Sequence, residues 1–167
     1  QKPVDVPKNH LIMTIGADVF HSRGKESIAS VVGTTDVDMT KYISYASKQP
    51  KRGQEIMENI ADMVLNCVKE FKKSNKRLPN TVVFYRDGVG AGQHNIVKKV
   101  EIESIKALFT KNFGNQSPKL VFVLVTKRIN DRFFETDKSG RRLFNPGHGL
   151  IVNENVVSDD KFDFFMV

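Results

Sequence analysis

The chain of 167 residues has little cysteine and no long apolar run. Its one thiol, Cys67, cannot form an intramolecular disulfide, so a disulfide-stapled secreted fold is excluded. The longest apolar runs are a few residues, well short of the ~20 that a membrane-spanning helix needs. Residues 1–10 are polar, contain two prolines and do not form a signal-peptide pattern. These absences predict an intracellular protein, cytoplasmic or nuclear, with no membrane partner.

Two common ligand-binding patterns are missing as well. The glycines at 88–92 are not followed by Gly-Lys-Ser/Thr, and Gln93 occupies the place of the third glycine in a G-x-G-x-x-G loop. Nucleotide-binding loops of both kinds are therefore excluded. The four histidines have no zinc-ligand spacing, and with one cysteine a structural zinc site is not expected.

Basic residues are in excess, with a formal net charge of +7 and a pI near 9.5. A basic domain attracts polyanions, and nucleic acid is the commonest of these. One basic group follows the last central strand and is expected to hold phosphates: Lys127, Arg128 and Arg132. A second group ends the long predicted helix and is interpreted as a solvated helix end: Lys72, Lys73, Lys76 and Arg77.

Hydrophobic periodicity predicts an α/β fold. After an extended lead-in at 1–10, strands are expected at 11–18, 27–35, 41–48, 81–86, 119–126 and 162–167. An apolar stripe from Ile56 to Phe71 predicts a long helix, and a second helix is expected around 101–113. The β-β-β-α-β-α-β order indicates a mixed five-stranded sheet flanked by helices, with an additional C-terminal strand. The strand at 119–126 is nearly all apolar, so we expect it to be covered on both faces.

Two aspartates end predicted strands. If the strands that end at Asp18 and Asp87 are adjacent and parallel, their ends lie about 5 Å apart. Two carboxylates this close repel unless a cation lies between them, and Mg²⁺ prefers such hard oxygen ligands. The alternative is that both are ordinary turn residues, since Asp is common after strands.

Glu55 is predicted to lie in the first turn of the long helix. A carboxylate there is favourable by about 0.3–1 kcal/mol through the helix dipole alone. The helix dipole alone therefore explains a glutamate at position 55, without a catalytic role.

Four segments together resemble Argonaute/Piwi proteins: TIGADVFH (14–21), RGQEIMENI (52–60), VVFYRDGVGAGQ (82–93) and VTKRINDRFF (125–134). NPGHGLIV (145–152) is similar to the N-P-x-x-G-T element of that family. The resemblance covers essentially the whole chain in order and leans toward the Piwi branch. It implies an RNase H-like Piwi domain. The chain has no initiator Met and stops inside an apolar strand pattern, so 1–167 is expected to be one partial domain whose C-terminal end is missing.

The resemblance also implies an activity. Asp18 and Asp87 match the family's metal-binding aspartates, and Glu55 matches its mobile catalytic glutamate. Lys127, Arg128 and Arg132 match a segment that contacts the guide backbone in relatives. The implied reaction is hydrolysis of one phosphodiester in a target RNA paired to a small guide RNA, with Mg²⁺ or Mn²⁺ as cofactor. The family's fourth catalytic residue, His or Asp, would follow Val167, so the isolated piece is expected to be inactive.

Other functions stay open from the sequence. The parent protein is either a guide-dependent RNA endonuclease or a non-cleaving guide-RNA-binding silencing factor that recruits partners. Without the resemblance, Asp-ended strands beside a glycine loop also suit a stand-alone RNase H-fold nuclease or a flavodoxin-like phosphotransfer module.

Overall fold

The computed structural model describes residues 9–127, 129–157 and 162–167. The predicted lead-in at 1–10 therefore lies outside the described residues except for its last two positions. The chain forms two compact units, Gln1–Lys127 and Arg128–Val167. Among the described residues, no helix combines the length and apolar character that crossing a membrane requires.

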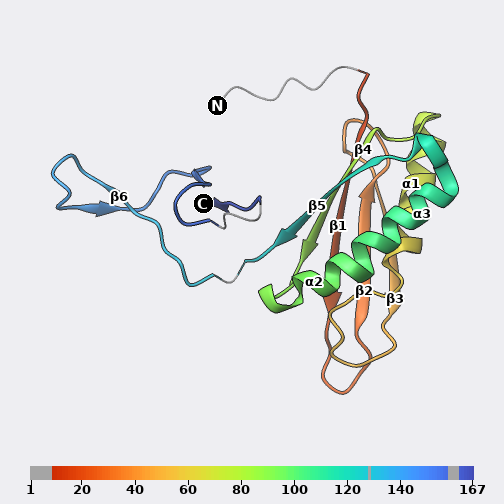
Figure 1. Cartoon of the computed structure of the whole chain (residues 1–167), viewed down its shortest axis with the longest axis horizontal. Helices are drawn as coiled ribbons and strands as arrows, with labels where there is room; N and C mark the ends of the chain where they lie inside the picture. Colours follow the sequence, from red (N-terminus) through yellow and green to blue (C-terminus); the bar gives the residue numbers. More distant parts are fainter. Residues whose placement is uncertain (1–8, 128, 158–161) are drawn as a thin grey trace. The chain divides into compact units, whose positions relative to one another are not determined.

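A five-stranded sheet with the strand order β3-β2-β1-β4-β5 forms the first unit (Figure 1). Its strands are β1 (Ile12–Phe20), β2 (Ile28–Thr34), β3 (Tyr42–Lys48), β4 (Thr81–Asp87) and β5 (Lys119–Val125). β1–β2 and β2–β3 pair antiparallel, whereas β1–β4 and β4–β5 pair parallel. The predicted mixed sheet is confirmed. The antiparallel pairs rule out the flavodoxin-like alternative, whose doubly wound sheet is parallel.

The helices pack on one face of this sheet. α1 (Ile60–Asn75) and α3 (Glu103–Phe113) lie side by side there (Figure 1). A 3₁₀ turn η1 (Ala91–Gln93), a short α2 (His94–Val97) and a π-helical segment η2 (Lys98–Ile102) precede α3, and a 3₁₀ turn η3 (Gly114–Gln116) follows it.

Strand alternation decides which side chains enter the core. Met13, Ile15, Ala17 and Val19 of β1 are buried with residues of α1 and α3. Because successive strand residues point to opposite faces, the intervening positions, including Asp18, face away from the helices. Cys67 is fully buried in this core, and burial raises the pKa of its thiol to about 12.

Two details of the predicted elements are wrong. β5 is the edge strand of the sheet, and none of its seven residues is buried: Lys119 and Val121 are exposed and the other five are half-buried, so it is not covered on both faces. The long helix begins at Ile60 rather than near Ile56. The backbone before Ile60 is bonded to side chains instead of to a helical turn: the Met57 N–H donates to Glu101 Oε1 at 2.9 Å.

In the described residues of the second unit, two pairs of short strands are formed. β6 (Glu135–Thr136) pairs with β7 (Leu143–Phe144), and β8 (Ile151–Val152) pairs with β9 (Phe165–Met166). In the first turn the Ser139 hydroxyl donates to Asp137 and holds the pKa of that carboxyl below its usual value. The expected C-terminal strand is therefore present but shorter than 162–167, because only two of its residues pair with β8.

Candidate active site

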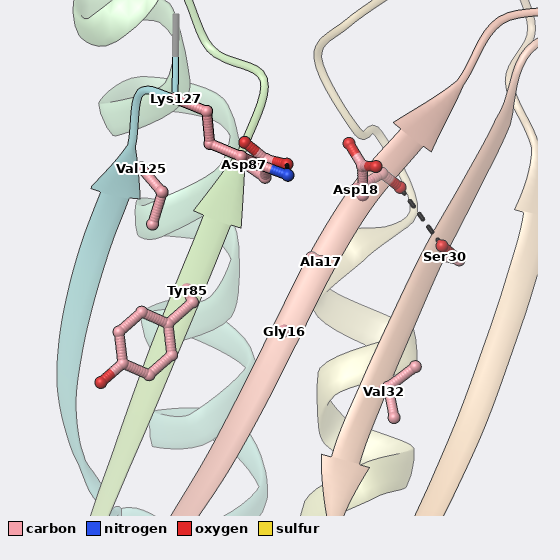
Figure 2. A pocket seen from close by; sticks show the side chains of 9 residues that line it. All are labelled: Gly16, Ala17, Asp18, Ser30, Val32, Tyr85, Asp87, Val125 and Lys127. Atoms are coloured by element: carbon pink, nitrogen blue, oxygen red, sulfur yellow. Dashed lines mark hydrogen bonds and ion pairs between the residues drawn. The ribbon is translucent and has the colours of Figure 1, made fainter.

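Asp87 is the last residue of β4, and Asp18 lies two residues before the carboxyl end of the neighbouring parallel strand β1, which continues past the predicted end to Phe20. The register pairs Ala17 with Arg86, so the next residue of each strand is an aspartate at the same level of the sheet. Figure 2 shows both side chains on the face of the sheet that points away from the helices. They line a cavity of about 330 Å³ together with residues that include Ser30. The structure therefore places the two carboxylates as the sequence hypothesis requires.

A cation already accompanies this carboxylate pair. Lys127, two residues after β5, places its Nζ 2.5 Å from Asp87 Oδ2 (Figure 2). The hydrogen bond and the charge of Asp87 raise the pKa of the Lys127 ammonium, and the Asp18 carboxylate adds to the shift. The negative charge of the two aspartates at this cavity therefore favours a positively charged group beside them.

Glu55 approaches the same place, although the prediction that it lies in the first turn of a helix is wrong. Its Oε1 accepts from Arg86 Nη1 at 3.1 Å, and its Oε2 lies 2.8 Å from His21 Nε2. A Cβ at Gly88 would lie 3.1 Å from Glu55 Oε1 and 3.6 Å from Asp18 Oδ1. The Glu55 and Asp18 carboxylates therefore flank Gly88, whose φ of +87° also favours glycine.

Arg86 and Glu101 form a buried ion pair behind Glu55. Both side chains are fully buried, and Arg86 Nε lies 3.2 Å from Glu101 Oε2. Burial raises the pKa of Glu101, although the nearby Arg86 charge opposes the shift. Arg86 also donates to the backbone carbonyls of Glu55 and Asp87. This guanidinium therefore ties the end of β4 to the segment that carries Glu55.

His21 and Ser27 hold Glu55 from the other side. The Gly53 N–H donates to Ser27 Oγ at 3.0 Å, and Ser27 Oγ lies 2.7 Å from His21 Nδ1. A hydroxyl that accepts from Gly53 can donate to His21 Nδ1, which leaves the protonated Nε2 to donate to Glu55. These hydrogen bonds join the loop between β1 and β2 to the segment before α1.

Arg86, Glu101 and His21 are site residues that the sequence pattern did not single out. For Arg86 a signal was available, because it continues the alternation of Val82 and Phe84 on the core side of β4. A charged side chain at a core position needs a buried partner. No comparable local pattern marks Glu101 or His21.

The donor atoms at the cavity fit a hard divalent cation. Among the described residues, no group of three or more His, Cys, Asp or Glu side chains is arranged to hold a metal ion. Two aspartates that share one cavity are nevertheless enough for Mg²⁺, which proteins usually bind through one or two carboxylates, with water and phosphate oxygens at the other positions.

The prediction that Arg128 and Arg132 hold phosphates beside this cavity stays a prediction. Arg128 lies outside the described residues. Arg132 belongs to the second unit, where its Nη1 donates to the carbonyls of Ile129 and Asp131, both at 2.8 Å. Lys127, the first of the three residues expected to contact RNA, lines the cavity.

Comparisons with known proteins show which family the chain is similar to. The family model described as "Piwi domain" matches residues 1–167. The chain is 35% identical over 157 residues to Piwi-like protein Ago3 of Bombyx mori and 34% identical over 166 residues to Piwi-like protein 1 of Gallus gallus. These alignments cover 93% and 98% of this chain but 17% and 19% of the relatives, so the chain spans less than a fifth of their length.

Solved structures show the same similarity. The C-terminal lobe of a budding yeast Argonaute has a TM-score of 0.80 and 31% identity, with 93% of this chain and 34% of that chain covered. Kluyveromyces polysporus Argonaute with a guide RNA has a TM-score of 0.77 and 30% identity, with 95% of this chain and 20% of that chain covered.

Proposed function

Because the chain belongs to the Argonaute/Piwi family, we propose that it carries the carboxylates of an RNA-cleaving site in a small-RNA-guided silencing protein. The observation that supports this proposal most directly is the meeting of Asp18 and Asp87 at the ends of adjacent parallel strands. The substrate is a target RNA paired to a guide RNA, and the net charge of +7 suits such a polyanion.

In this proposal Asp18 and Asp87 hold Mg²⁺ or Mn²⁺. When bound, the ion supplies Lewis-acid stabilisation of the negative charge that develops on the phosphate. Their carboxylates lie on an open face of the sheet, so a phosphodiester backbone can reach them without entering the core (Figure 2).

Glu55 and Lys127 have separate tasks. Arg86 and His21 hold the two Glu55 oxygens, and this fixes the carboxylate on the side of Asp18 that Gly88 leaves open. Lys127 is mostly exposed. When RNA binds, its ammonium group can leave the ion pair with Asp87 and bind a phosphate oxygen instead. Backbone contacts of this kind read the shape of an A-form duplex, so the choice of target sequence belongs to the guide.

The test is made in the full-length protein that contains this chain, loaded with a guide RNA. We expect Asp87→Ala to lower the rate of target cleavage by at least about 100-fold, beyond the loss typical of residues that only support a metal ligand. Guide affinity should stay within about twofold, because in this proposal Asp87 holds the metal ion at the target phosphate, whereas the guide is held by separate contacts to its backbone. Asp38→Ala is the matched control, since Asp38 is an exposed aspartate in the β2–β3 turn.

Two outcomes would contradict the proposal. A parallel loss of guide binding and cleavage in Asp87→Ala would assign Asp87 to RNA binding or to folding. Guide binding without any cleavage by the native protein, in Mg²⁺ or in Mn²⁺, would identify a non-cleaving silencing factor instead.

A further inference from the structure

A second cavity, of about 730 Å³, lies at the opposite end of the sheet from the carboxylates. It is bordered by the end of α1, the turn before β4 and the segment that leads into β5. Asp87 is six residues along β4 from Thr81, the first residue of that strand, which corresponds to about 20 Å at the usual strand rise. The two cavities are therefore separate places on the first unit.

This second cavity is basic. Its lining includes Lys72, Lys76, Arg77 and Lys119 and contains no acidic residue. Within the described part of the chain, none of these four forms an ion pair. The sequence interpretation of a solvated helix end is correct in that Lys72, Lys76 and Arg77 are exposed, but the structure adds Lys119 from β5 and gathers the charges around a hollow.

One of the four basic residues, Lys76, adopts a backbone conformation that is unfavourable for lysine. It ends α1 with φ 61° and ψ 6°, the left-handed conformation in which glycine is the usual residue. A lysine there is less favourable for the backbone than glycine. Its side chain nevertheless lines the cavity.

We propose that this basic cavity binds an acidic peptide segment of a partner protein. Carboxylates would form charge-assisted hydrogen bonds with the unpaired ammonium groups. The Asn115 and Gln116 side chains, which also line the cavity, supply amide donors and acceptors for a peptide backbone. Single-stranded RNA fits less well, because the lining contains no Phe, Tyr or Trp on which a base could stack, and the His10 ring in it is half-buried and hydrogen-bonded to Thr81 Oγ1.

Fluorescence anisotropy with a labelled glutamate-rich peptide tests the proposal on this chain. The double variant Lys72→Gln/Lys76→Gly removes two cavity charges, and the glycine substitution relieves the left-handed backbone at position 76, so we expect the variant to stay folded. We expect the dissociation constant to rise about fivefold or more, given the energy of exposed ion pairs. The matched control Lys69→Gln/Lys73→Gln removes two charges from the same helix outside the cavity and should change affinity less than about twofold.

Three results would overturn the proposal. One is an equal loss of peptide affinity in both double variants, which would mean that only net charge matters. Another is no binding of the peptide by the native chain at low salt. The third is that the cavity variant loses affinity for a single-stranded RNA oligonucleotide while its affinity for the peptide is unchanged, which would assign the cavity to RNA.

Discussion

Glu101→Ala tests the buried network that holds Glu55. The substitution leaves Arg86 fully buried with Glu55 as its remaining carboxylate partner, and it removes the acceptor of the Met57 N–H. Breaking a buried ion pair costs about 3–5 kcal/mol, and the low end applies because Arg86 keeps one partner. The unsatisfied Met57 N–H adds about 1 kcal/mol. The free energy of unfolding should therefore fall by about 4 kcal/mol.

Urea unfolding followed by circular dichroism measures this change. With a denaturant slope of about 2 kcal/mol/M, a loss of this size lowers the unfolding midpoint by about 2 M. Glu103→Ala is the control, because Glu103 is half exposed and its ion-pair partner, Lys106, is exposed as well; its loss should be below about 1 kcal/mol. If the two substitutions cost the same, the Arg86–Glu101 pair contributes nothing specific to the fold.

Two further predictions concern Cys67 and Gly88. Because burial raises the pKa of the Cys67 thiol from 9.0 to about 12, the folded chain should react with a disulfide reagent at least about 100-fold more slowly than the urea-unfolded chain, as thiolate is the reactive form. The raised pKa also means that the contribution of this thiol to stability is complete below pH 9.0 and is lost as the pH rises toward about 12; a Cys67→Ala variant that showed the same alkaline decrease in stability would contradict this. Gly88→Ala should cost about 1–3 kcal/mol, since it combines a left-handed backbone with a Cβ 3.1 Å from Glu55 Oε1. Gly90→Ala, where a Cβ meets nothing within 4 Å, should change the unfolding midpoint little, and equal effects of the two would refute the close approach.

The elements of the first unit were largely predictable from local pattern. Strand alternation predicted β1, β2, β3 and β4 to within about two residues, because burying one face of a strand imposes a period of two on neighbouring residues. The same local signals placed Asp87 at the end of its strand, as observed, and Asp18 at the end of its strand, although β1 continues two residues further to Phe20. β5 shows the limit, since its apolar run also suits an edge strand that is only partly covered.

The position of Glu55 was not predictable from local pattern. The apolar stripe that begins at Ile56 indicates a helix, but contacts with residues distant in sequence keep the chain before Ile60 out of it. His21, Arg86 and Glu101 are 31 to 44 residues from the positions they contact in this segment. Such partners leave no periodic trace near Glu55.

The sequence alone therefore determined the order of strands and helices, the basic charge and the two aspartates at strand ends, because each depends on residues that are neighbours in the chain. Tertiary structure alone decided that β1 and β4 are parallel neighbours, that a buried arginine orients Glu55, and that Lys72 and Lys119 line one cavity. These outcomes depend on hydrogen bonds, ion pairs and packing between distant segments, and the free energy of such contacts exists only when the whole sheet has formed.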